Sequence, residues 1–353
     1  DRFEYIYPNY RYSKDLENSY FSNGNLNFVS HGYQKQYNTN VYDGVLINDI
    51  NFDSSPSYSK KGIKNDYQIL FRNVNSKAIN SGNYNKDANA KLLSSLQFNT
   101  KFPLYKKTSK SQNYLTPIAS FRLSPNNTKN IRNLDRTVNY NNIFSLDRFG
   151  QDDMVEGGSS LTLALEYSSR NKNDNEIINL AIANVLRPSK NDDLPINNSI
   201  GEKRSDIIGR VNFIPSNNFN LDYEFSLDNN LKDSNLNLIR TNFSVNNFVT
   251  SFEFLEESNF IGNKSYISNE TTLNLNKNNS ISFKTNKDLD KNITEYYNLV
   301  YEYKNDCLIA GVEYNKSNYS DGNLKPEENL FFKIKIIPFG ELNTPSVKKW
   351  KRI

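Results

Sequence analysis

The feature that most constrains this chain is a strict alternation of apolar and polar residues. It is clearest in residues 218–230, where one set of positions alternates with the other: Phe219, Leu221, Tyr223, Phe225 and Leu227 against Asn220, Asp222, Glu224 and Ser226. Successive side chains of a β-strand point to opposite faces, so the pattern predicts a strand with one apolar and one polar face. The apolar face would pack on the core of a soluble sandwich, or meet lipid in an outer-membrane barrel.

The same alternation recurs along the chain, with short polar links between most segments. The segments are 66–73, 91–100, 115–124, 160–168, 176–186, 205–214, 218–228, 235–246, 248–256, 268–276, 279–287, 293–303, 307–316 and 329–338. Strands of roughly nine to eleven residues fit an outer-membrane barrel better than the short rhythm of a sandwich. We predict an all-β fold, an antiparallel transmembrane β-barrel of about 14 to 16 strands. A soluble β-solenoid or multi-sheet protein is the alternative.

Composition separates folded from disordered alternatives. Mean hydropathy is −0.74, yet 13% of the residues are aromatic, which a disordered chain would not show. The net charge of +4 comes from interspersed charges without a basic block, so nucleic-acid binding is not expected. Paired asparagines such as Asn229-Asn230 and Asn278-Asn279 favour turns, although AT-rich codon usage would enrich asparagine equally well.

The longer polar stretches and the first residues of the chain indicate where in the cell the protein and its loops would lie. The stretches 48–64, 74–89, 125–142 and 188–204 are expected to be loops on the extracellular side of a barrel, or surface loops of a soluble protein. No apolar run reaches the length of a membrane-spanning helix. The first residues lack the features of a signal peptide, which favours either a cytosolic protein or a mature or truncated piece of a longer one.

A turn-rich acidic segment, NIFSLDRFGQDDMVEGG at 142–158, leads into a strongly alternating strand. Hard cations take several oxygen ligands, so one hypothesis is a metal site made by four carboxylates, Asp147, Asp152, Asp153 and Glu156. A solvated loop that enters a strand explains the same residues more simply, and we favour it. The segment DLDKNIT at 288–294 is not a calcium loop, because Ile293 stands where such a loop needs glycine.

A hydrolase is the remaining catalytic hypothesis. His31 is the only histidine of the chain, and Ser30 precedes it. Neighbours in a strand point to opposite faces, and the sequence has no G-x-S-x-G elbow. We therefore interpret His31 as a surface or lumen residue and expect no catalytic residue.

Several stretches in order resemble the outer-membrane LPS-assembly protein family, LptD, also called OstA or Imp. They are TPIASFRLSPN (116–126), IRNLD (131–135), NIFSLDRFGQDDMVEGG (142–158), RSDIIGRVNFIPSNNFNLDYEFSLD (204–228), NDCLIAGVEYNKS (305–317) and LKPEENLFFKIKIIPFGEL (324–342). The third is similar to the family signature, carried by Asp147, Arg148, Phe149, Glu156, Gly157 and Gly158. Residues 1–100 match only loosely.

The resemblance implies a non-enzymatic machine without cofactors in the outer membrane of a Gram-negative bacterium. Such a barrel receives lipopolysaccharide (LPS) from periplasmic bridge proteins through an N-terminal domain. It encloses an LptE-like lipoprotein plug and releases LPS into the outer leaflet through a lateral gate between its first and last strands. A general porin and a surface β-rich adhesin are the alternative functions.

The resemblance also assigns parts of the chain. Residues 1–342 would be the C-terminal portion of a very large barrel, and 343–353 a tail, because the family's signal peptide, periplasmic domain and early strands have no counterpart. Cys307, the only cysteine, stands where family members form a disulfide with that missing domain. The last strand, with Leu330, Phe332, Ile334 and Ile336, would form one side of the gate; an ordinary edge strand is the alternative.

Overall fold

The computed structural model of the chain describes residues 4–16, 23–37, 40–196, 198–258, 263–318, 326–337, 340–343 and 347–348. Within them the fold is all-β: the strands belong to one sheet, and the only regular helix is a single 3₁₀ turn, η2 (Ser199–Gly201). The registered strand pairs are antiparallel. No helix of the described part is long and apolar enough to cross a membrane.

The chain divides into two compact units. Unit 1 comprises residues 1–108, 113–167 and 181–208, and unit 2 comprises 109–112, 168–180 and 209–353. The strands of unit 1 are β1 (Glu4–Leu16), β2 (Gly24–Tyr37), β3 (Tyr42–Ser54), β4 (Ser57–Tyr58), β5 (Lys64–Ile79), β6 (Asn89–Lys101), β7 (Leu104–Lys107) and most of β8 (Ser111–Ser124). Parts of β9 (Gly158–Asn171) and β10 (Glu176–Leu186) complete it.

Sequence periodicity located the later strands well and the first three poorly. Each of the fourteen predicted segments coincides with a strand from β5 onward. In contrast, β1 and β2 were not predicted, and residues 48–54 of the stretch 48–64 that we expected to be a loop belong to β3. The cause is composition: β3 carries Asn48, Asp49, Asn51 and Asp53 among its apolar residues, so its polarity resembles that of a loop.

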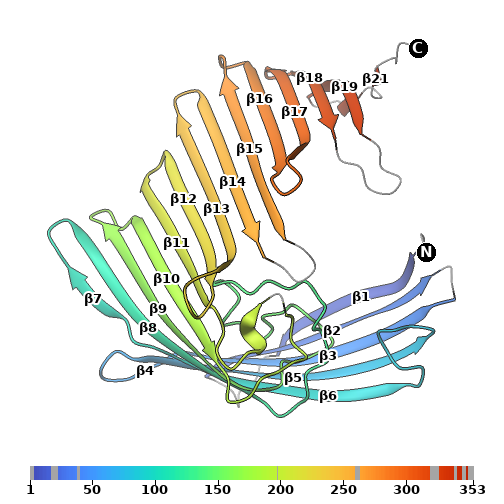
Figure 1. Ribbon diagram of the computed structural model, residues 1–353, viewed down its shortest axis with the longest axis vertical. Coiled ribbons are helices and arrows are strands. Elements are labelled where there is room, and N and C mark those ends of the chain that lie inside the picture. The colour runs from blue at the N-terminus through green and yellow to red at the C-terminus, as the bar shows by residue number, and fades with distance from the viewer. Residues whose placement is uncertain are drawn as a thin grey trace. The chain divides into compact units, whose positions relative to one another are not determined.

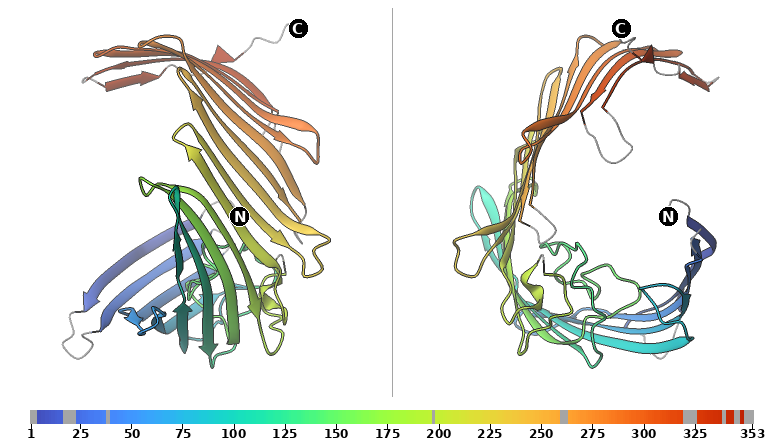
Figure 2. Two further views of the ribbon diagram at one scale, coloured as in Figure 1. Left: turned by 90° about the vertical axis from the view of Figure 1, so that its left-hand side faces the viewer. Right: turned by 45° about the vertical axis from the view of Figure 1, so that its right-hand side comes forward.

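The two faces of the unit 1 sheet have different surroundings. Segments 125–157 and 187–206, which follow β8 and β10, lie against one face, here called the loop face (Figures 1 and 2). The opposite, open face carries large apolar side chains that remain 43 to 48% exposed, Ile50, Phe71, Phe98 and Phe121. They occupy directly paired positions on β3 and β5, and on β6 and β8, so this part of the open face presents an apolar surface.

Two apolar clusters hold the segments to the loop face. The larger one joins both loop segments to β10 and to the start of β11 (Ile207–Ser216), through Ile131, Val138, Tyr140, Ile143, Phe149, Met154, Ala181, Ala183, Val185, Leu194, Ile200 and Ile208. The smaller one packs Val155 against β3, β5 and β6, through Val45, Ile47, Leu70, Val74 and Leu93. The two segments are therefore loops, as the sequence predicted for 125–142 and 188–204, and they form a packed layer on the sheet of unit 1.

Unit 2 is a run of antiparallel hairpins. Its strands are β11 (Ile207–Ser216), β12 (Phe219–Leu227), β13 (Ser234–Val245), β14 (Phe248–Glu257), β15 (Lys264–Asn274), β16 (Asn279–Asp288), β17 (Ile293–Lys304), β18 (Leu308–Ser317), β19 (Glu327–Ile336), β20 (Gly340–Asn343) and β21 (Val347–Lys348). The tip of the β9–β10 hairpin also belongs to it. The predicted hairpin at 297–314 is present, with a turn at Asn305, whose N–H donates to the Leu308 carbonyl at 2.8 Å.

The alternation of apolar and polar residues along β12 places the two sets of side chains on opposite faces of the sheet. Asp222 and Glu224 lie on the face that carries Arg240 of β13, and Arg240 Nη1 is 3.2 Å from Glu224 Oε1. Tyr223 and Phe225 lie on the opposite face, with ring centroids 5.3 Å apart. The prediction of one polar and one apolar face for this strand is therefore confirmed.

Turns follow the expected asparagine chemistry. Asn40, Asn80, Asn246 and Asn292 all adopt positive φ between strands, a conformation that asparagine tolerates better than most residues.

Consecutive links of an antiparallel sheet join alternate ends of the strands. The link 55–63 and the link 80–88 therefore lie at opposite ends of β5. The prediction that the polar stretches 48–64 and 74–89 form loops on the same side of the sheet is wrong.

Candidate functional site

The six residues of the predicted signature converge on the loop face of unit 1. Arg148, Phe149 and Glu156 are each less than 5% exposed, and Gly157 and Gly158 lead directly into β9. Asp147 is only partly buried, with 30% of its side chain exposed. Sequence reasoning grouped these residues as a motif, and the structure shows what they contact.

Glu156 is at the centre of a buried charge cluster. Its carboxylate accepts hydrogen bonds from three arginines: Arg148 of the same loop, with Nε 2.6 Å from Oε2, Arg122 of β8, at 2.8 Å, and Arg187 just after β10, at 2.5 Å. The side chains of all four residues are at most 3% exposed. One carboxylate thus joins the loop to β8 and to the residue that directly follows β10.

The electrostatics of this cluster follow from its composition. Burial alone would raise the pKa of Glu156, but the attraction of Arg148 and Arg122, with the Arg148 hydrogen bond and Arg187, holds the pKa well below its ordinary value of 4.5. Three guanidinium groups share one carboxylate, so neutral acceptors complete the cluster. Arg122 donates to Gln97 Oε1 at 2.9 Å and to the Ser145 carbonyl, and Arg187 donates to the Gly157 carbonyl at 2.7 Å.

A second arginine site fixes the middle of the signature loop. Arg72 of β5 makes a bidentate pair with Asp49 of β3, both contacts being 2.8 Å. Its Nη1 donates to the carbonyls of Gln151 and Met154 at 2.9 and 2.8 Å. Asp147 Oδ2 lies 3.8 Å from the same guanidinium group, and burial, only partly offset by Arg72, raises the pKa of Asp147.

The two signature glycines are required by close packing and by backbone conformation. A Cβ on Gly157 would lie 2.1 Å from the carbonyl oxygen of Asn126, while its N–H donates to Thr128 Oγ1 at 2.9 Å. Gly158 has a φ of +84°, a conformation that favours glycine. The loop thus turns into β9 against the chain that leaves β8.

The link between β5 and β6 also contacts the signature loop. Tyr84 donates to Asp153 Oδ2 at 2.7 Å, and Lys129 Nζ lies 4.6 Å from the centre of the Tyr84 ring. Burial and the hydrogen bond with Tyr33 raise the pKa of Tyr84. His31 Nε2 lies 3.5 Å from Asp152 Oδ2, outside hydrogen-bond geometry. The link between β5 and β6 therefore helps to hold the signature loop in place at Asp153.

The carboxylates of the metal hypothesis are used in other ways. Glu156 binds arginines, Asp147 faces Arg72, Asp153 binds Tyr84, and Asp152 is 62% exposed beside His31. Among the described residues, no group of three or more His, Cys, Asp or Glu side chains is placed to hold a metal ion. The loop is nevertheless buried at Glu156, so the simpler expectation of a solvated loop is wrong as well.

Arg122, Arg187, Arg72 and Asp49 are contacts that sequence reasoning missed. Arg122 lies within a segment quoted for the family resemblance, where its only distinctive feature is a charge on the polar side of a strand. Arg187 comes directly before Pro188 and lies 31 residues from Glu156. Their partners are distant in sequence, so only the strand pairing reveals the cluster.

The remaining predicted residues lie in unit 2, apart from this cluster in the chain. Cys307 is exposed in the β17–β18 turn, where its N–H donates to Asn305 Oδ1 at 2.9 Å and its carbonyl accepts from the Ile337 N–H. The predicted gate residues Phe332, Ile334 and Ile336 are 44 to 47% exposed on β19. Besides β18, β19 pairs with the short β20 and β21; residues 344–346 and 349–353 of the expected tail lie outside the described part.

These features define a class of protein: an antiparallel sheet with one polar and one apolar face, in which a long loop is held by buried arginine–carboxylate contacts. A profile of the family described as "LptD: LPS transport system D" matches residues 49–261, more than half of the chain. The chain belongs to this family, and its place is the outer membrane of a Gram-negative bacterium. The match includes the whole signature loop and all three arginines of the Glu156 cluster.

Comparison with solved structures gives only distant similarities. The siderophore receptor PirA of Acinetobacter baumannii is 8% identical, with a TM-score of 0.46, over 94% of this chain and 65% of that one. The ferric enterobactin receptor PfeA of Pseudomonas aeruginosa is 7% identical, with a TM-score of 0.42, over 92% and 62%. A mutant Rh. blastica porin is 8% identical, with a TM-score of 0.32, over 84% and 93%. No curated protein matches the chain.

Proposed function

We propose that the chain forms part of the wall of a machine that carries LPS to the outer leaflet of the outer membrane. The observation that carries this proposal is the Glu156 cluster, which lies within the region matched by the LPS transport family. The Glu156 carboxylate is taken up by arginines, so it fixes the loop and does not act as a proton donor or acceptor. The role is transport, without a bond made or broken.

The two faces of unit 2 support this role. On the apolar face, Phe252, Phe283, Leu299 and Phe332 are 36 to 46% exposed, as expected of side chains in contact with lipid acyl chains. On the polar face, Arg240 bridges Glu224 and Glu253, and Lys284 pairs with Glu270 at 3.2 Å. Such a surface suits the hydrophilic sugars and phosphates of LPS.

Link lengths support an orientation. In unit 2 the links at one end of the strands have two to four residues, at 217–218, 246–247, 275–278 and 305–307. Those at the other end have four to nine residues, at 228–233, 258–263, 289–292 and 318–326. Outer-membrane proteins have short turns on the periplasmic side and longer loops outside. Cys307 lies in a short turn and is exposed, as a disulfide with a periplasmic domain requires.

The strand β19 is proposed as one side of the lateral gate. Leu330, Phe332, Ile334 and Ile336 all lie on one face of it, in register with Tyr314, Val312, Ala310 and Leu308 of β18. On its other side, within the described residues, β19 pairs with the short β20 over four residues and with the short β21 over two. An edge with so few hydrogen bonds separates from a neighbouring strand at low cost. The partners of the machine would be an LptE-like lipoprotein plug and periplasmic LPS-bridge proteins.

Depletion of the whole protein in its host tests the proposal. We expect LPS to disappear from the cell surface and to accumulate inside the outer membrane, and a plasmid copy to restore it. Unchanged surface LPS, together with ion conductance of the purified protein in planar bilayers, would contradict the proposal and indicate a porin. A Cys307→Ser variant tests the disulfide, because it should abolish a reduction-sensitive shift on non-reducing gels.

A further inference from the structure

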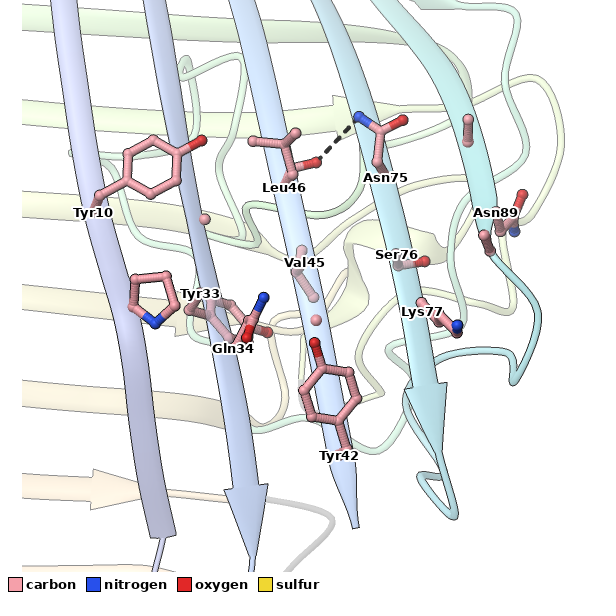
Figure 3. Close-up of a pocket in the computed structure, with 15 residues that line it drawn as sticks. Tyr10, Tyr33, Gln34, Tyr42, Val45, Leu46, Asn75, Ser76, Lys77 and Asn89 are labelled. Carbon is pink, nitrogen blue, oxygen red and sulfur yellow. Dashed lines mark hydrogen bonds between the residues drawn. The ribbon is translucent and has the colours of Figure 1, made fainter.

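The open face of unit 1 contains a groove of about 500 Å³ over β1, β2, β3 and β5 (Figure 3). Two glycines form its floor, Gly32 of β2 and Gly44 of β3. A Cβ on Gly32 would lie 2.7 Å from the Val45 carbonyl oxygen, and one on Gly44 would lie 2.7 Å from Tyr42 Oη. The absence of side chains at these two positions is therefore what opens the groove.

The register places the lining residues in two neighbouring rows on the open face. Gly32 is paired with Tyr10 on one side and with Leu46 on the other. Gly44 is paired with Gln34 and with Lys77. Leu46 lies on the same face of β3 as Ile50, which is 43% exposed. A row of polar side chains, Ser30, Asn48 and Asn73, joined by hydrogen bonds, separates the groove from the apolar surface that begins at Ile50.

The groove is lined by aromatic, amide and cationic side chains. Tyr10 and Tyr42 provide two aromatic rings, and Gln34 and Asn75 provide amides that can both donate and accept hydrogen bonds (Figure 3). Lys77 is exposed and provides a cation. Aromatic rings stack on the apolar faces of sugar rings, amides bind hydroxyl groups, and an ammonium group binds phosphate. These side chains together suit a phosphorylated saccharide.

The position of the groove fits a lipid headgroup. It lies at the ends of β2, β3 and β5 that adjoin the links 38–41 and 80–88. Antiparallel pairing puts the two longest loops of unit 1, 125–157 and 187–206, at the same end, which by loop length is the extracellular end. A headgroup at this level would leave its acyl chains beside Leu46, Ile50 and Phe71.

We propose that this groove binds the phosphorylated sugar headgroup of a glycolipid in the outer leaflet, with Lys77 at the phosphate and Tyr10 and Tyr42 at the sugar rings. The inference rests on the proposed function for the orientation of the sheet and for the contact of the open face with lipid. It adds a binding site on the outer surface, separate from the polar face that would carry LPS in transit. The site would retain the glycolipid beside the protein after release.

Photo-crosslinking tests the site. The full-length protein, with p-benzoylphenylalanine at Gln34, is reconstituted in phosphatidylcholine nanodiscs that contain either a phosphorylated diglucosamine lipid or the same fraction of phosphatidylglycerol. A reporter at Leu123, which is 46% exposed near the same end of β8, is the control. We expect several-fold more glycolipid captured at Gln34 than at Leu123, and no such preference for phosphatidylglycerol.

Two variants refine the result. Lys77→Gln removes the cation and Gly44→Leu fills the floor, where only the mobile end of Tyr42 must shift. Each should lower glycolipid capture at Gln34 to the Leu123 level, while Lys106→Gln, an exposed lysine outside the groove, should not. Equal capture at both reporters, or equal capture of both lipids, would overturn the site. If neither reporter captures any lipid, the lipid-facing assignment of the proposed function fails instead.

Discussion

Arg148 and Glu156, eight residues apart in one loop, hold each other through a bidentate contact that is shielded from water, with Arg148 Nε 2.6 Å from Glu156 Oε2. The same carboxylate accepts from Arg122 and Arg187, so the loop is closed on itself and fixed to the sheet by one group. Removing that group would leave three buried guanidinium groups without their counter-charge.

Glu156→Gln should therefore lower the free energy of unfolding by about 3 to 5 kcal/mol, the usual cost of breaking a buried ion pair from one side. The measurement is the folded fraction against urea in detergent micelles. Glu202→Gln, which breaks the exposed Lys190–Glu202 pair, is the matched control and should cost at most about 1 kcal/mol. Similar small losses for both variants would show that the Glu156 cluster contributes little to stability.

Acidification should destabilise the protein through the same residue. The pKa of Glu156 is lowered in the folded state, so below its ordinary value of 4.5 the unfolded chain binds a proton that the folded chain does not. The contribution of Glu156 is therefore complete near neutral pH and declines as the pH falls below about 4.5. The raised pKa of Asp147 acts in the opposite direction, so an Asp147→Asn variant should retain the decline.

The check is the urea midpoint at pH about 7, about 5 and about 4. A midpoint that stays constant or rises on acidification would be incompatible with a lowered pKa of Glu156.

Gly157→Ala should destabilise the start of β9. Its Cβ would lie 2.1 Å from the backbone oxygen of Asn126, which cannot move without displacing the chain after β8. We expect a loss of roughly 2 to 4 kcal/mol. Gly82→Ala is the control, because nothing lies within 4 Å of the position that its methyl group would take. Equal urea midpoints for the two variants would exclude the close approach at Gly157.

Charge scanning of β12 tests which face meets lipid. Arg in place of Tyr223, on the apolar face, should cost about 2 to 4 kcal/mol in a bilayer if the position lies near the midplane. Arg in place of Asp222, on the polar face beside Arg240, should cost much less. Folding titrations in lipid vesicles measure both. Equal costs would mean that the two faces of β12 have the same surroundings.

The sequence predicted the long strands from β5 onward, though not the short β7, β20 and β21, because each long strand has one apolar face, which leaves a period of two in the residues. It did not predict β1 to β3, where polar residues occur on both faces, as at Asn48 and Asp49 of β3. The local sequence does not show which face of the sheet an asparagine or aspartate will occupy, because that depends on pairing with a strand elsewhere in the chain.

The site was predictable in part. The family resemblance selected Arg148, Phe149, Glu156 and the two glycines, and these residues do anchor the loop. Their charge partners could not be found, because Arg72, Arg122 and Arg187 approach the loop only after β5, β8 and β10 have paired with their neighbours. The burial of Glu156 also contradicts its sequence context, since a turn-rich acidic segment ordinarily stays in water.

The most direct measurement is in-cell photo-crosslinking across one strand of unit 2. Ser282 and Phe283 are neighbours on β16 and lie on its polar and apolar faces, opposite Thr272 and Thr271 of β15. With p-benzoylphenylalanine at either position in the full-length protein, LPS should be captured at Ser282 while export is active, and capture should cease when LPS synthesis is blocked. Capture at Phe283 alone, or at neither position, would contradict a path for LPS along the polar face.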